Sequence, residues 1–242
     1  GNVIVTGFTN GSLDGNILVG FQDLFIVKYD SNGTKIWSKT LGGAGLFTEG
    51  LAIATDSSGN IYVTGDTNGN IDGNTLIGTQ DFLVAKYDPS GTKQWTKTLG
   101  ATGVNTYGRG VSVDPSGNVY ITGETNGNLD GNTLTGTSDA YLTKYNSSGG
   151  KQWTMQLGAS GSYAFAQGIS IDYSGNIFVI GYTGGSLPGN TLVGTADLFI
   201  CKYFSTGVLV WVKQLGVSGG TTNATSGVVD SFGNIFAGGY TT

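Results

Sequence analysis

Three loops of the sequence carry oxygen-bearing side chains at a spacing that could hold a calcium ion. One loop runs Asn68-Gly-Asn-Ile-Asp72-Gly, and similar loops start at Asn10 and Asn126. Side-chain oxygens at positions one, three and five, with glycine at position six, match the front half of an EF-hand loop. Position twelve, which normally supplies a bidentate glutamate, holds no carboxylate in any of the three. The candidate calcium ligands are Asn10, Asp14, Asn68, Asn70, Asp72, Asn126, Asn128 and Asp130.

The same loops have a second interpretation as hairpin turns. Asp-Gly and Asn-Gly pairs favour turns whose residues have positive φ, and the Asx side chains then bond to their own backbone. The corresponding loop of the last repeat departs further from the calcium pattern, because it carries Gly184, Ser186 and Pro188. Each loop supplies one carboxylate, so we expect any calcium binding to be weak and expect no other cofactor.

A second group of candidate residues lies in the loops that lead into the first strand of each repeat. Copies of the repeat disagree there: Arg109 stands where the other copies have Leu51, Gln167 and Thr225. Loops on a rigid scaffold are the usual place for recognition, although relaxed surface sequence would look the same. The candidate ligand-binding residues are Phe47, Glu49, Tyr107, Arg109, Tyr163 and Phe165.

Composition excludes several chemistries. The chain of 242 residues has no histidine and one cysteine, which rules out a His-dependent triad, a Cys-rich zinc site and an internal disulfide. A net charge of -5, with the lysines spread along the chain, opposes nucleic-acid binding. No apolar run approaches the length of a membrane span. We expect no enzymatic activity; a paired-carboxylate hydrolase that uses Glu49 or Glu124 is the catalytic alternative.

An internal repeat must position these residues. Gly-Asn followed by a β-type run begins at residues 1, 59, 117, 175 and 233, so each copy starts 58 residues after the last. Within one copy, four short β-type segments (110–114, 118–122, 140–145 and 151–157) alternate with turns such as Asp114-Pro-Ser-Gly117. Four-stranded antiparallel units in tandem are typical of propeller blades. The sequence therefore predicts an all-β propeller in one domain, residues 1–242, with a partial fifth copy over 233–242.

The ends of the chain suggest how such a propeller closes. Naming the strands of a unit A to D, the chain enters at a B strand (Val3–Thr6) and leaves after an A strand (227–230) and a B strand (235–238). Sharing one closing blade between the two ends would remove open sheet edges. We therefore predict four blades. The surplus B strand either joins the closing blade or belongs to a longer array.

The repeat resembles a known family. The segments Asp114–Gly123, Asp81–Asp88 and Gly91–Trp95 leading to Gly100 are similar to the bacterial β-propeller repeat called SBBP, and every copy carries all three. A weaker similarity links the chain to quinoprotein and outer-membrane assembly propellers. The resemblance implies a secreted, periplasmic or cell-surface protein.

We expect a non-catalytic binding or scaffold module for a protein or a surface polymer, with its partner on one end of the propeller. The alternative is a carbohydrate-binding, lectin-like propeller with one weak site per blade. A third hypothesis is a quinoprotein-like or polysaccharide-processing enzyme.

Overall fold

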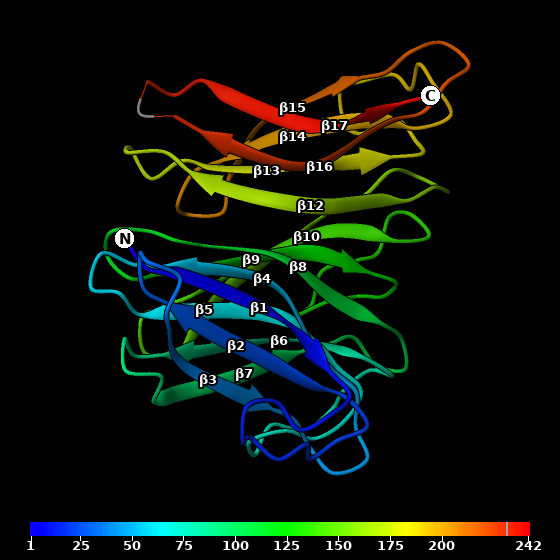
Figure 1. Ribbon diagram of the computed structural model, residues 1–242. Coiled ribbons are helices and arrows are strands. Elements are labelled where there is room, and N and C mark those ends of the chain that lie inside the picture. Colours follow the sequence, from blue (N-terminus) through cyan, green and yellow to red (C-terminus); the bar gives the residue numbers. More distant parts are fainter. Residues whose placement is uncertain (231) are drawn as a thin grey trace. The chain divides into compact units, whose positions relative to one another are not determined.

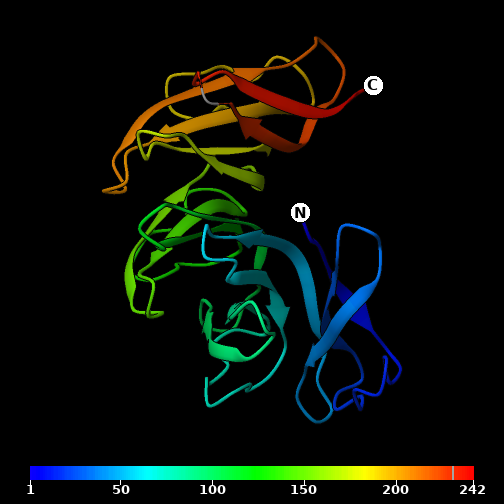
Figure 2. The same ribbon diagram turned by 60° about the vertical axis from the view of Figure 1, so that its left-hand side comes forward.

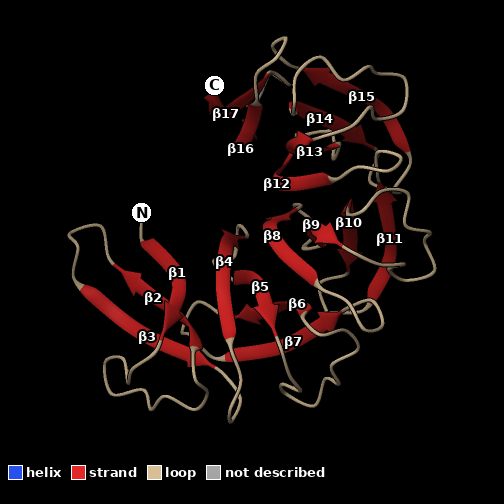
Figure 3. Cartoon of the chain, turned by 90° about the vertical axis from the view of Figure 1, so that its right-hand side faces the viewer, coloured by secondary structure: helices blue, strands red, loops and turns tan. Residues whose placement is uncertain are grey.

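The computed structural model describes residues 1–230 and 232–242, and every regular element in them is a β-strand (Figures 1 and 3). In this part of the chain no helix has the length and apolar character that crossing a membrane requires. The chain divides into two compact units, residues 1–108 and 109–242, with the boundary inside one strand.

The first unit contains a three-stranded antiparallel sheet in the order β1-β2-β3 and a four-stranded antiparallel sheet in the order β4-β5-β6-β7. The strands are β1 (Val3–Thr9), β2 (Asp23–Tyr29), β3 (Lys35–Leu41), β4 (Thr48–Thr55), β5 (Ile61–Thr67), β6 (Asp81–Tyr87) and β7 (Lys93–Leu99). The next strand, β8 (Thr106–Val113), leads into the second unit.

The second unit contains two four-stranded antiparallel sheets, β8 to β11 and β12 to β15, and the two-stranded sheet β16-β17. Strand β12 packs against β9 on one side and β16 on the other, so consecutive sheets stack on one another, as the yellow, orange and red strands of Figure 2 show. The strands are β9 (Val119–Thr125), β10 (Asp139–Tyr145), β11 (Lys151–Leu157), β12 (Ala164–Ile171), β13 (Ile177–Thr183), β14 (Asp197–Tyr203), β15 (Leu209–Leu215), β16 (Thr222–Val229) and β17 (Ile235–Thr241).

The predicted blade is confirmed. The sheets β4–β7, β8–β11 and β12–β15 each have four antiparallel strands in chain order, A to D, which is the propeller unit. The first sheet supplies strands B, C and D, and the last supplies A and B. Together they supply the strands of one blade and the one surplus B strand that the sequence indicated; their union in one closing blade stays a prediction.

The turns form as their residues predict. In Asp114-Pro-Ser-Gly117 the Gly117 N–H donates to the Asp114 carbonyl at 2.8 Å, and Gly117 has φ +78°. The matching turn at Asp88 closes through Gly91, with φ +83° and an N–O distance of 3.0 Å. Only glycine adopts this left-handed conformation at little cost, so these positions fix tight hairpins.

The core lies between the sheets. In the first unit Leu24 and Ile26 of β2 are fully buried and pack with Val63 and Leu83 of the next sheet. Burying each such side chain contributes roughly 1.5–3 kcal/mol. Trp37 joins this cluster, and a Cβ at Gly91 of the following repeat would lie 3.1 Å from its ring. Trp153 lies in the same way 3.1 Å from a Cβ at Gly207, so these two indoles pack against the following copy, as expected from their fixed spacing.

A buried aspartate in every repeat closes the long loop between strands B and C. Asp139 is fully buried and accepts hydrogen bonds from the N–H groups of Thr135 and Gly136, both at 2.8 Å. A Cβ at Gly158 would overlap with this carboxylate, which explains the glycine there. Loop closure thus uses residues that all copies share. The equivalent carboxylates are Asp23, Asp81 and Asp197.

Candidate functional site

The position at which the copies disagree most is a β-bulge. The register between strands A and B skips one residue, which is Leu51 in β4, Gln167 in β12 and Thr225 in β16. Arg109 holds the corresponding position in β8. A bulge redirects a side chain out of the regular alternation of the strand. The shared backbone therefore presents one variable side chain per repeat.

A glycine opposite the bulge makes it possible. A Cβ at Gly181 of β13 would overlap with the carbonyl oxygen of Phe165 and lie 2.9 Å from the Ala166 Cα. Gly65 and Gly239, at the same position of their repeats, meet the backbone of β4 and β16 in the same way. The close approach of two backbones thus requires glycine here.

An ion pair occupies this region in the sheet β8–β11. Arg109 donates from Nε and Nη2 to Glu124 Oε1, at 3.1 and 2.9 Å. Glu124 is only 7% exposed, and its Oε2 atom has no hydrogen-bond partner among the described residues. Burial raises the pKa of Glu124, and the hydrogen bonds and charge of Arg109 offset this only in part.

Aromatic rings gather at the next sheet, β12–β15. Tyr163 stacks on Phe165 with ring centroids 4.8 Å apart, and Tyr182 meets both edge-on, at 6.2 and 5.5 Å. Phe165 and Tyr182 lie directly opposite each other on β12 and β13. Burial raises the pKa of Tyr182, and the nearby groups Glu124, Tyr163 and Tyr240 raise it further. The rings and the ion pair therefore belong to one neighbourhood.

The last sheet adds an amide and a phenol. Asn223 on β16 faces Tyr240 on β17, and its Nδ2 donates to the Tyr240 hydroxyl at 2.9 Å. The Asn223 Oδ1 atom is buried and has no hydrogen-bond partner in the described part of the chain. We call the whole set the unit-2 cluster. It consists of Arg109, Glu124, Tyr163, Phe165, Tyr182, Asn223 and Tyr240.

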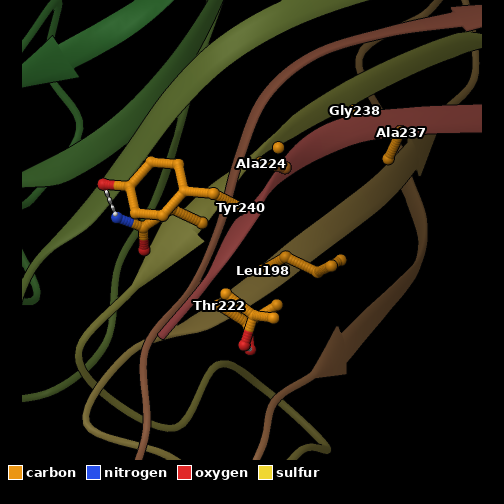
Figure 4. A pocket seen from close by; sticks show the side chains of 9 residues that line it. Leu198, Thr222, Ala224, Ala237, Gly238 and Tyr240 are labelled. Atoms are coloured by element: carbon orange, nitrogen blue, oxygen red, sulfur yellow. Dashed lines mark hydrogen bonds between the residues drawn. The ribbon is translucent and has the colours of Figure 1, made fainter.

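Residues of β16 and β17, together with Leu198, line a crevice of about 210 Å³, and two of these residues, Asn223 and Tyr240, belong to the cluster. Its labelled residues Leu198, Ala224 and Ala237 give it an apolar surface, and Tyr240 with its hydrogen bond lies to one side of them (Figure 4). The crevice therefore combines an apolar surface with two polar residues of the cluster.

The first unit holds different residues at the same positions. Glu49 lies opposite Asp66, and the side-chain amides of Gln22 and Gln80 donate to these two carboxylates. Cross-strand neighbours of this kind have Cβ atoms roughly 5 Å apart. Both acids of this pair are thus engaged by glutamines of neighbouring loops.

The remaining candidate residues of the first unit make contacts of their own. Phe47 contacts Phe21 at 5.5 Å between ring centroids, and both rings are exposed. Tyr107 accepts a hydrogen bond from Asn105 at 2.9 Å. Phe47, Glu49 and Tyr107 are therefore held in the first unit, while Arg109, Tyr163 and Phe165 come together in the second.

The loops with calcium-like spacing form hairpin turns. Asp14, Asp72 and Asp130 have φ of 55°, 50° and 53°, and the glycine after each also has positive φ. This is the type I′ arrangement that Asp-Gly favours, so the hairpin interpretation is confirmed. Each carboxylate forms an ion pair with a lysine of strand D, namely Lys35, Lys93 or Lys151.

The other candidate calcium ligands also have partners within the chain. Asn70 and Asn128 each accept a backbone N–H at 2.8 Å inside their own loop. Asn68 accepts the Phe47 N–H at 2.9 Å, Asn126 donates to a carbonyl, and Asn10 is exposed. No group of three or more carboxylate or thiol side chains surrounds a metal position within residues 1–230 and 232–242. Calcium binding at these loops stays a prediction.

The β-propeller repeat model named SBBP matches residues 36–72, 94–130, 152–188 and 210–242. The chain belongs to the SBBP β-propeller repeat family. Each match begins in strand D of one SBBP sheet and contains strands A and B of the next, so it includes the bulge position and the residue opposite it; the first three matches also reach the hairpin loop that follows strand B.

Two curated proteins are similar to this SBBP chain. One is an uncharacterized WD repeat-containing protein of Acanthamoeba polyphaga mimivirus, 29% identical over 81% of this chain and 18% of that protein. The other is the regulatory protein FlaEY of Caulobacter vibrioides, 29% identical over 73% of this chain and 20% of that protein. The SBBP chain spans about a fifth of the length of these relatives.

Solved structures also resemble the SBBP chain at low identity. A protein of unknown function from Bacteroides caccae is 13% identical with a TM-score of 0.49, over 96% of this chain and 64% of that one. A gluconolactonase from Xanthomonas campestris is 13% identical with a TM-score of 0.47, over 90% of this chain and 65% of that one.

Sequence reasoning selected part of the unit-2 cluster of this SBBP protein. It placed Arg109, Tyr163 and Phe165 among the candidates but omitted Tyr182 and Tyr240 from them. These two lie within strand B, where an aromatic residue suggests core packing. A comparison of the copies would have identified Tyr182 and Tyr240, because the equivalent residues of the other copies are the acids Asp66 and Glu124.

Proposed function

We propose that this chain is a non-catalytic binding module of a secreted or bacterial cell-surface protein, and that the unit-2 cluster holds its protein or surface-polymer partner. The observation that carries the proposal is the contrast between scaffold and cluster. Loop-closing aspartates, turn glycines and indoles recur in every repeat, whereas the cluster stands at positions where the copies differ.

The chemistry of the acids supports binding over catalysis. Glu124 forms an ion pair with Arg109, and the carboxylates of Glu49 and Asp66 accept hydrogen bonds from glutamine side chains. A hydrolytic pair needs one carboxyl group that protonates a leaving group and one that activates water or attacks. The arrangement offers partly exposed rings and hydrogen-bonding groups, which is the composition of a recognition surface.

A biosensor experiment tests this proposal. The chain is immobilised and exposed to peptidoglycan, lipopolysaccharide, capsular polysaccharide and a fraction of bacterial surface proteins. The cluster variant is Tyr163→Thr, which takes the residue that Thr221 provides at the same position of the next copy. The matched control is Thr225→Gln, which takes the residue of Gln167 at an exposed bulge outside the cluster.

We expect wild type to bind one of these samples, Tyr163→Thr to bind about tenfold or more weakly, and Thr225→Gln to bind like wild type. Equal effects of the two substitutions, or no binding by wild type, would contradict the proposal. Binding that is insensitive to Tyr163→Thr and rises with ligand density would favour the lectin-like alternative with one weak site per blade.

A further inference from the structure

We propose that the unit-2 cluster binds a neutral saccharide, whose hydroxyl groups donate hydrogen bonds to Glu124 Oε2 and Asn223 Oδ1. This inference rests on the proposed function, because it names the ligand class of the same site.

Two buried acceptors without partners are the starting observation. Glu124 Oε2 and Asn223 Oδ1 are the buried side-chain atoms of the described residues for which no hydrogen bond is formed. Leaving such an atom unsatisfied costs about 1–3 kcal/mol, so native proteins keep few of them. A carboxylate oxygen and an amide oxygen only accept. The group that satisfies them must therefore be a donor.

The charge around these acceptors selects a neutral donor. Arg109 already places its guanidinium 2.9 Å from Glu124 Oε1, so the carboxylate is compensated. An ammonium or guanidinium ligand would bring a second positive charge beside Arg109, and an anionic ligand would face Glu124 in a site of reduced solvation. A hydroxyl group donates without adding charge.

The rings provide the complementary apolar surface. Tyr163, Phe165 and Tyr182 are partly exposed and lie within 6.2 Å of one another between ring centroids. Aromatic side chains combine a large apolar face with, for tyrosine, a polar hydroxyl. A sugar ring offers the matching pair of properties, an apolar C–H face and a rim of hydroxyls.

The cluster also predicts the stoichiometry. In the first unit the positions equivalent to Phe165 and Tyr182 hold the acids Glu49 and Asp66. Among the described residues of that unit, these positions therefore form neither the aromatic group nor the ion pair of the unit-2 cluster. We therefore expect one saccharide per chain and not one per blade.

The experiment combines a glycan array with calorimetry. The array carries neutral hexose oligosaccharides beside sulfated and uronic-acid glycans, and the strongest neutral glycan is then titrated into the soluble chain. The test variants are Glu124→Gln, which replaces the Oε2 acceptor with a donor, and Asn223→Ala. The matched control is Glu49→Gln, which makes the same chemical change in the first unit. The unfolding midpoint of each variant confirms that it is folded.

We expect neutral glycans to bind with a stoichiometry of one. Glu124→Gln and Asn223→Ala should each weaken binding by about tenfold, as expected for a buried hydrogen bond, and Glu49→Gln should change it by less than about twofold. An array without neutral binders, a preference for charged glycans, or equal affinity in all three variants would overturn the inference.

Competition on the biosensor separates this inference from the proposed function. Suppose that the chain binds a surface-protein sample, that Tyr163→Thr abolishes this binding, and that neutral glycans do not compete. The proposed function then holds and the saccharide assignment fails. If Tyr163→Thr also leaves the biosensor signal unchanged, both fail together.

Discussion

Replacing the glycine opposite a bulge should destabilise the protein, and Gly181→Ala is the sharpest case. The new Cβ would overlap with the Phe165 carbonyl oxygen and lie 2.9 Å from the Ala166 Cα. Both are backbone atoms and cannot rotate away. An extra carbon in a packed site typically lowers the free energy of unfolding by about 1–3 kcal/mol, whereas replacing a glycine within a strand raises it by roughly 0.5–1 kcal/mol. Because the overlap is with backbone, we expect a net loss of about 2 kcal/mol.

Urea unfolding, followed by tryptophan fluorescence, measures this loss as a change in midpoint at constant slope. The matched control is Gly238→Ala on β17, where the nearest atom to the new Cβ is the Ser226 hydroxyl at 3.5 Å. This control should change the free energy of unfolding by less than about 1 kcal/mol. A Gly181→Ala variant as stable as wild type would refute the requirement for close backbone approach at the bulge.

Three further outcomes follow from the loops. Asp139→Ala removes the acceptor of two loop N–H groups and should cost about 3–5 kcal/mol in urea unfolding, far more than the exposed change Thr225→Gln. Lys93 and Thr96 outweigh burial and lower the pKa of Asp72, so its stabilisation is present above the ordinary pKa of aspartate and lost as pH falls. Asp72→Asn should therefore lower the melting temperature at pH 7, and this difference from wild type should shrink progressively as the pH falls below the ordinary pKa of aspartate. Calcium at about 10 mM should stabilise the chain by about 1.4 kcal/mol over chelator if a loop binds it with a millimolar dissociation constant, and an unchanged melting temperature would contradict the calcium prediction.

The fold could be predicted because its determinants are local and repeated. Turns such as Asp114-Pro-Ser-Gly117 mark strand ends in the sequence, and the fixed spacing of the indoles indicates that equivalent surfaces meet between repeats. The loop-closing role of Asp139 was harder to predict, since it depends on the path of the loop between β9 and β10.

The candidate site could be predicted only in part. Differences between copies identified Arg109, because comparing copies needs no structure. The pairing of Arg109 with Glu124 is not visible in the sequence, since it depends on how the neighbouring strands β8 and β9 lie in their sheet. The buried Asn223 Oδ1 atom, which accepts no hydrogen bond from the described residues, is likewise a result of packing, and no pattern of residue types predicts it.

The most direct test of the central claim exchanges residues between copies. The double variant Arg109→Leu and Glu124→Asp gives the sheet β8–β11 the residues that Leu51 and Asp66 provide at the same positions of the sheet β4–β7. Affinity for the neutral glycan selected on the array is then measured by calorimetry beside the melting temperature. We predict a chain that keeps its cooperative unfolding and loses at least about tenfold in affinity, because shared residues build the scaffold and differing residues bind. Unchanged affinity in a folded double variant would contradict this account.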